Sequence, residues 1–159
     1  MYAYTLAFIK HKDEILLVNR NKNPWMGGWN GVGGKIKRDE TPIDGVIREI
    51  FEETGIRVTP NQIQDKGVLT WNDFDALGKG LHIFLVEVEP TFVYHTPIQT
   101  SEGILDWKKI SWINNLDNFG IATNIPYFLP IVLSDDHKYH YHCTFEDKDL
   151  KAVTKERMD

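Results

Sequence analysis

The stretch that decides the fold is residues 34–56, GKIKRDETPIDGVIREIFEETGI, where helix signals and acidic side chains coincide. Thr41 is a favourable N-cap residue, Pro42 suits the first helical position, and Asp44 places a carboxylate where the helix dipole favours it. Gly55 supplies a helix stop. These signals predict a helix that begins at Pro42 and ends just before Gly55.

The predicted helix, residues 42–54, has two different faces. At about 100° per residue, apolar side chains collect on one side and three carboxylates on another, with the two centres roughly 140° apart. The carboxylates belong to Glu49, Glu52 and Glu53, and neighbours at this spacing lie about 5–6 Å apart at Cβ and repel one another. Mg²⁺ meets such a need, because it prefers oxygen ligands and is usually held by a few carboxylates together with substrate phosphates. The alternative is a solvated acidic face. The apolar group consists of Ile43, Val46, Ile47, Ile50 and Phe51.

The segment before the helix favours the metal interpretation. Five glycines fall within residues 27–34, which implies positive φ angles or a close approach of the backbone to a ligand. Exposed backbone of this kind can approach phosphate or metal. In addition, Arg48 lies four residues ahead of Glu52 and can pair with it.

Strand and helix patterns continue along the rest of the chain. The predicted strands cover residues 2–10, 14–19, 67–72, 81–89, 105–107 and 138–145. The remaining segments are predicted as a turn at 73–80, an irregular stretch at 91–103, a helical turn at 110–116 and a second helix at 125–133. No repeat or linker interrupts them, so we expect one mixed α/β (α+β) domain over residues 1–159 with a charged tail from about residue 147.

Composition limits the class of partner and compartment. The chain has 159 residues, enough to bury roughly two-thirds of its unfolded surface in one core. Its formal charge of -5 argues against a polymeric nucleic acid as partner, and a polyanionic small ligand would need a cation. Cys143 is a single cysteine, no apolar run reaches transmembrane length, and the first residues lack a basic leader. We therefore expect a cytoplasmic protein with no membrane partner, as a monomer or homodimer.

A family resemblance rests on one motif. The chain reads Gly34-x5-Glu40-x7-Arg48-Glu49-Ile50-x-Glu52-Glu53-x-Gly55-Ile56, and it matches the Nudix box, G-x5-E-x7-R-E-U-x-E-E-x-G-U with U a bulky aliphatic residue, without a departure. The chain thus resembles the Nudix (MutT-like) hydrolases and, more weakly, from about residue 4 to 145, the 8-oxo-dGTP diphosphatases. The resemblance implies an α/β/α sandwich with a mixed β-sheet. It also implies hydrolysis of a nucleoside diphosphate linked to another group, with Mg²⁺ or Mn²⁺.

The resemblance assigns roles to the acidic residues. Glu49, Glu52 and Glu53 match the metal-binding and base carboxylates of the family, with Glu49 or Glu53 as the general base. The Gly33 carbonyl matches a backbone metal ligand. Glu102 resembles the distal acidic residue that MutT-type enzymes bring to the metals; the alternative is a plain loop glutamate.

Basic and neighbouring groups follow from the same resemblance. Arg48 would orient a glutamate by a charge-assisted hydrogen bond, and Glu40 would belong to the same acidic network. Arg20, Gly34 and Lys35 resemble substrate-binding positions near the phosphates. Arg20 and Lys35 are equally compatible with surface cations.

Two asparagines are the candidates for reading a base. Asn30 and Asn124 resemble residues of the base pocket in oxidised-purine hydrolases, and an amide offers both a donor and an acceptor to a purine edge. The alternative for either asparagine is that it caps or turns the backbone. Animal relatives carry two adjacent aspartates where this chain has Asn124 and Ile125, so their mode of base reading does not transfer.

These patterns lead to one functional hypothesis and two alternatives. The first is an Mg²⁺-dependent pyrophosphohydrolase that cleaves an oxidised purine dNTP, such as 8-oxo-dGTP, to the monophosphate and pyrophosphate. The second is a hydrolase of another conjugate, such as ADP-ribose or a nucleotide sugar, and the third is a non-catalytic nucleotide-binding module. The histidines His137, His140 and His142 are expected to be structural or solvent-facing, because no further metal ligands accompany them in the sequence.

Overall fold

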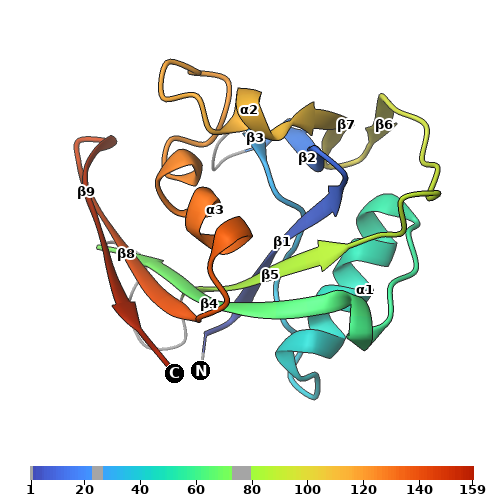
Figure 1. Cartoon of the computed structure of the whole chain (residues 1–159), viewed down its shortest axis with the longest axis horizontal. Coiled ribbons are helices and arrows are strands. Elements are labelled where there is room, and N and C mark those ends of the chain that lie inside the picture. Colours follow the sequence, from blue (N-terminus) through green and yellow to red (C-terminus); the bar gives the residue numbers. More distant parts are fainter. Residues whose placement is uncertain (1, 23–26, 73–79) are drawn as a thin grey trace.

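A mixed β-sheet forms the centre of the computed structural model, which describes residues 2–22, 27–72 and 80–159 (Figure 1). The strands are β1 (Tyr4–His11), β2 (Glu14–Arg20), β3 (Trp29–Asn30), β4 (Ile63–Trp71), β5 (Leu81–Glu87), β6 (Ile98–Thr100), β7 (Gly103–Lys109), β8 (Tyr139–Glu146) and β9 (Asp149–Arg157). The helices are α1 (Pro42–Thr54), α2 (Ile110–Ile113), α3 (Ile125–Ser134) and the 3₁₀ helix η1 (Pro60–Gln62). The strand order is β6-β7-β2-β1-β5-β4-β8-β9, and β3 pairs with β2. The strands predicted at residues 2–10 and 14–19 correspond to β1 and β2, which pair antiparallel as a hairpin.

The sheet contains both strand orientations. β1 pairs with β5 and β4 pairs with β8 in parallel, whereas the other ladders are antiparallel. The predicted mixed sheet is therefore confirmed.

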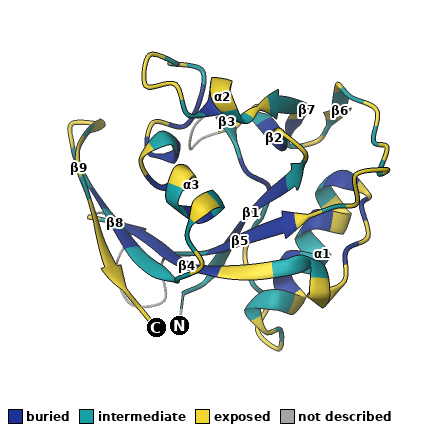
Figure 2. Cartoon of the chain, in the orientation of Figure 1, coloured by how far each residue is buried: buried dark blue, intermediate teal, exposed yellow. Residues whose placement is uncertain are grey.

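Each face of the sheet is covered by a helix (Figure 1). Along β1, Leu6 and Phe8 point to a core that includes α3, whereas Ala7 and Ile9 point to a second core that includes α1. This division follows from the two-residue repeat of a strand. The central strands are buried on both sides (Figure 2), and the expected α/β/α arrangement is confirmed.

Helix α1 follows the local signals closely. The Thr41 hydroxyl accepts a hydrogen bond from the Asp44 N–H at 3.1 Å, and Gly55 ends the helix at φ 76°. Val46 is completely buried against the sheet. Phe51 differs from the prediction, because it is 41% exposed at the edge of the apolar face.

A guanidinium covers the exposed Phe51 ring. Arg57 lies over it with its Cζ atom 4.2 Å from the ring centroid. A cation in this position is attracted by the negative face of the ring.

The C-terminal segment is more ordered than its charges suggest. The prediction that residues 138–145 form the last strand before a charged tail is wrong, because residues 149–157 form β9 and pair with β8. A ladder is made by backbone groups, so exposed charged side chains do not prevent it. Leu150 and Val153 also pack against the core that includes α3.

Smaller differences concern element limits. The stretch 91–103, predicted as irregular, contains β6, and the strand predicted at 67–72 begins earlier, at Ile63. The turn predicted at 73–80 falls almost entirely on residues 73–79, which lie outside the described residues. Within the described ranges, no helix has the length and apolar character needed to cross a membrane.

Candidate active site

Arg48 is the centre of an ionic network on α1. Its Nε and Nη2 atoms donate to the two carboxylate oxygens of Glu40 at 2.6 and 2.8 Å, a bidentate pair. Its Nη1 atom donates to Glu49 at 2.9 Å and to Glu52 at 3.1 Å, so the predicted pairing with Glu52 is confirmed. Its Nη2 atom also donates to the Lys35 carbonyl at 3.0 Å. With its donors directed to protein groups, Arg48 is placed to orient carboxylates.

Glu40 is tied firmly into this network. The hydrogen bonds from the Arg48 guanidinium and from the Lys37 backbone N–H lower the pKa of Glu40 to about 2. Glu40 therefore stays ionised at any ordinary pH. It anchors Arg48 from outside the helix, in the loop before Thr41.

Four carboxylates from two parts of the chain line one cavity. Glu49, Glu52 and Glu53 come from α1, and Glu102 comes from the turn between β6 and β7. The cavity has a volume of about 180 Å³ and is completed by Thr100 and Ser101. The structure thus brings Glu102 to the acidic helix face, although it lies 49 positions after Glu53 in the chain.

The electrostatics of this cavity demand positive charge. Burial, followed by the charges of Glu49 and Glu102, raises the pKa of Glu53 to about 8, against a hydrogen bond from Gly33 and the charge of Arg20. A divalent cation would offset the unfavourable burial of the ionised Glu53 carboxylate beside Glu49 and Glu102. Carboxylate oxygens are the ligands that Mg²⁺ and Mn²⁺ prefer. The donor set therefore fits such an ion.

The carboxylate side chains would need to move to complete a coordination sphere. Glu49 and Glu52 each turn one oxygen to Arg48. In the part of the chain that the structure describes, no three histidine, cysteine, aspartate or glutamate side chains already surround a common point as metal ligands.

Two glycines bring the backbone against the acidic face. A Cβ atom on Gly34 would lie 2.6 Å from the carboxylate carbon of Glu49, and one on Gly33 would lie 2.1 Å from the Thr5 carbonyl oxygen. The Gly34 N–H and carbonyl both contact the Thr5 hydroxyl at 3.2 Å. A side chain at either glycine would therefore displace the neighbouring groups.

The two candidate cations lie in different settings. Arg20 ends β2 opposite Gly103, and its charge acts on the pKa of Glu53, so it lies near the carboxylates. Lys35 is exposed, and its backbone carbonyl serves Arg48. Arg20 is thus the more directly placed of the two.

The two candidate base-reading asparagines lie on neighbouring segments. Trp29, next to Asn30, pairs in parallel with Ile121, three residues before Asn124. The Asn30 side-chain oxygen accepts a bond from the following backbone N–H at 2.8 Å. Asn124 precedes α3 without capping it, is buried, and donates from Nδ2 to the sulfur of Cys143 at 3.9 Å.

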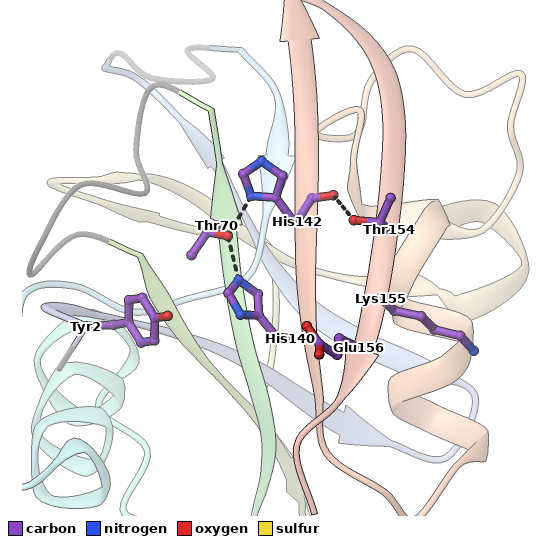
Figure 3. A pocket seen from close by; sticks show the side chains of 7 residues that line it. All are labelled: Tyr2, Thr70, His140, His142, Thr154, Lys155 and Glu156. Atoms are coloured by element: carbon purple, nitrogen blue, oxygen red, sulfur yellow. Dashed lines mark hydrogen bonds between the residues drawn. The ribbon is translucent and has the colours of Figure 1, made fainter.

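A larger groove lies elsewhere, on the face of β4, β8 and β9 (Figure 3). The Thr70 hydroxyl lies between two imidazoles, 2.7 Å from His140 Nε2 and 2.8 Å from His142 Nδ1. His137 lies apart, 3.6 Å from an Asp159 oxygen. The groove has a volume of about 580 Å³ and is lined by Tyr2, Thr70, His140, His142, Thr154, Lys155 and Glu156. Because it contains none of the α1 carboxylates, it is separate from the acidic cavity.

The sequence interpretation missed the residues that hold Glu102. Thr100 and Ser101 line the acidic cavity, and Asn21 contacts the same turn. A signal was available, since the run from Thr100 to Gly103, TSEG, combines a side chain that bonds the turn backbone with a glycine after it.

Comparison with known proteins gives the class. Residues 2–119 match the model of the NUDIX domain, and the chain belongs to the Nudix family. It is a Nudix hydrolase with the fold of that family.

Three relatives illustrate the range of the family. The chain is 29% identical over 150 residues to the oxidized purine nucleoside triphosphate hydrolase of Mus musculus, covering 92% of this chain and 88% of that protein. It is 35% identical over 83 residues to the ADP-ribose pyrophosphatase of Methanocaldococcus jannaschii, covering 52% of this chain and 48% of the relative. The crystal structure of the MutT mutator protein from Bacillus halodurans superposes with a TM-score of 0.74 at 25% identity, covering 98% of both chains.

Proposed function

We propose that this Nudix hydrolase is an Mg²⁺-dependent pyrophosphohydrolase of an oxidised purine nucleoside triphosphate, such as 8-oxo-dGTP, and releases the monophosphate and pyrophosphate. The observation that carries the reaction is the convergence of Glu49, Glu52, Glu53 and Glu102 on one cavity. The similarity to a mouse oxidized purine nucleoside triphosphate hydrolase over most of both chains supports the substrate class.

In this mechanism the oxygen of a water molecule forms a bond to a phosphorus of the substrate, the bridging P–O bond to the other phosphoryl group breaks, and the monophosphate and pyrophosphate separate. Mg²⁺ held by the four glutamates and by the Gly33 carbonyl would neutralise phosphate oxygens and lower the pKa of bound water. Glu49 or Glu53 accepts the proton of the attacking water. Arg48 keeps Glu49 and Glu52 oriented through the bonds at 2.9 and 3.1 Å.

The substrate phosphates would lie between the acidic cavity and the end of β2. Arg20 brings a positive charge to this region, as its effect on the Glu53 pKa indicates. The Gly34 backbone lies close to Glu49 because this residue has no side chain, and the Gly33 backbone bonds Glu53. We infer that Arg20, Gly34 and Lys35 contact the phosphates.

The purine would be read by the two asparagines. Asn124 is buried, and its amide nitrogen donates to a sulfur, which is a weak acceptor. A purine edge would offer stronger partners. Asn30 lies on β3 next to Trp29, whose backbone bonds that of Gly120 and Ala122. The segments that carry Asn30 and Asn124 are therefore joined by backbone hydrogen bonds.

The test is a comparison of kcat/KM with Mg²⁺ across 8-oxo-dGTP, dGTP, other dNTPs, ADP-ribose and nucleotide sugars, with product analysis. We expect 8-oxo-dGTP to be preferred over dGTP by more than about tenfold, which corresponds to roughly 1.4 kcal/mol. A smaller preference would contradict the oxidised substrate. Glu53→Gln should reduce turnover by orders of magnitude while the far-UV spectrum stays native, and Glu156→Gln, on the exposed strand β9, is the matched control.

ADP-ribose hydrolysis is the second candidate, favoured by the 35% identity to an ADP-ribose pyrophosphatase. It would yield AMP and ribose 5-phosphate in the same panel, so the products separate the two. A non-catalytic module would turn over nothing. The intact set of Glu49, Glu52 and Glu53 argues against that last alternative, because binding alone does not need all three.

A further inference from the structure

Glu102 sits in a tight hairpin between β6 and β7. Thr100 pairs with Gly103, which leaves Ser101 and Glu102 as the two loop residues. A two-residue loop on an edge hairpin has few contacts with the rest of a protein, so its orientation depends on local bonds.

Thr100 supplies two of these bonds from one hydroxyl. Its Oγ1 atom accepts a hydrogen bond from the Glu102 N–H at 3.2 Å and donates to the Gly103 carbonyl at 2.9 Å. Threonine at the first position of a turn commonly bonds the backbone two residues on. The Thr100 hydroxyl thereby holds the backbone at Glu102 and at Gly103.

Asn21, the residue after β2, contacts the same turn. Its backbone N–H donates to the Glu102 carbonyl at 3.1 Å, and its Nδ2 atom donates to the Ser101 carbonyl at 3.2 Å. Gly103 permits this approach, since a Cβ atom there would lie 1.8 Å from the Asn19 carbonyl oxygen. The turn is therefore joined to the end of β2 on one side and to itself on the other.

The hydrogen bonds from Thr100 and Asn21 act against electrostatic repulsion in the cavity. Glu102 shares the cavity with three carboxyl groups of α1, and no covalent link ties its turn to that helix. Like charges in one cavity repel, so a loose turn would swing Glu102 toward water. The bonds from Thr100 and Asn21 resist that movement.

We propose that Thr100 and Asn21 are positioning residues that hold Glu102 in the acidic cavity and so determine the affinity for the catalytic divalent cation. The inference rests on the proposed function in one respect, namely that Glu102 contributes to the cation site. Neither residue touches the substrate in this assignment; both act through Glu102.

The experiment measures the Mn²⁺ dissociation constant by electron paramagnetic resonance, without substrate, and turnover in parallel. The Thr100→Val substitution removes both hydroxyl bonds at nearly constant volume, and Thr100→Ser restores the hydroxyl. The Asn21→Ala substitution keeps the backbone bond and removes the one to Ser101. Thr96→Val is the matched control, because the Thr96 hydroxyl donates to Asp106 in the same region and, among the described residues, makes no hydrogen bond to the turn.

We expect Thr100→Val to weaken Mn²⁺ binding by about tenfold, as loss of a group that orients a metal ligand usually does, and Asn21→Ala to weaken it by a smaller factor. Thr100→Ser and Thr96→Val should stay near the wild type. In the Glu102→Gln background, Thr100→Val should have no further effect, which a merely structural role would not produce.

Several results would overturn the inference. They are an unchanged Mn²⁺ affinity in Thr100→Val, an equal loss with and without Glu102, or a wild-type affinity in Glu102→Gln. The last result would leave hydrolysis by the α1 glutamates intact. Conversely, a wild-type protein that hydrolyses no member of the substrate panel would refute the proposed function, while the Mn²⁺ titrations would still decide the role of Thr100.

Discussion

Removal of divalent metal should make the stability of this protein depend on Glu53 in a characteristic way. In the folded chain the pKa of Glu53 is raised to about 8 by burial and by Glu49 and Glu102, against an ordinary value of 4.5. Between these two pH values the folded state binds a proton that the unfolded state does not. The free energy of unfolding therefore falls as the pH rises from 4.5 to about 8.

The size of this effect follows from the two pKa values. Each pH unit between them is worth about 1.4 kcal/mol, so the loss over the whole window is on the order of 5 kcal/mol. Glu53→Gln has no proton to lose. In EDTA, the free energy of unfolding of Glu53→Gln should equal that of the wild type near pH 4.5. Above pH 8 it should be larger than that of the wild type by about this amount.

Urea denaturation at pH 5, 7 and 9, in EDTA and again in Mg²⁺, measures the effect. Glu156→Gln serves as the control for a change of charge alone, because Glu156 is exposed. In Mg²⁺ the wild type should be more stable than Glu53→Gln, since the ion binds the folded wild type and requires the ionised carboxylate. Parallel pH profiles for the wild type and Glu53→Gln in EDTA would refute the reasoning.

Substitutions at three further positions test other parts of the molecule. Gly34→Ala places a Cβ atom 2.6 Å from the Glu49 carboxylate carbon, so turnover and Mn²⁺ affinity should each fall by at least about tenfold; an unchanged kcat would contradict the close approach. Arg48→Ala removes the donors to Glu40, Glu49 and Glu52 and should lower kcat roughly 10–100-fold, and Arg48→Lys should not restore it, because an ammonium cannot form the bidentate pair. Thr70→Val leaves His140 and His142 without their shared hydroxyl, which should cost about 1–3 kcal/mol in chemical denaturation with normal turnover; a parallel loss of turnover would show that the groove and the acidic cavity are coupled.

The acidic helix illustrates what can be predicted from local sequence. Thr41, Pro42 and Gly55 act on the backbone within one turn of themselves, so the limits of α1 follow from neighbouring residues alone. The relative placement of Glu49, Glu52 and Glu53 is then set by the helical repeat, and so is the Arg48–Glu52 pair.

The C-terminal strand shows the opposite case. Residues 149–157 are rich in charge and carry no regular apolar alternation, so nothing local predicts β9. The strand forms because β8 offers an unpaired edge to its backbone, and backbone pairing is indifferent to the exposed side chains.

The chemistry of the site divides along the same line. The sequence by itself determined the family and the acidic helix, because these depend on residues that lie close together in the chain. Only the tertiary structure decided that Glu40 pairs with Arg48 from outside the helix and that Glu102 lines the same cavity. It also decided that Thr100 and Asn21 bond the turn that carries Glu102. Such contacts join segments far apart in the chain, and their positions are set by the packing of the whole sheet and not by local preference.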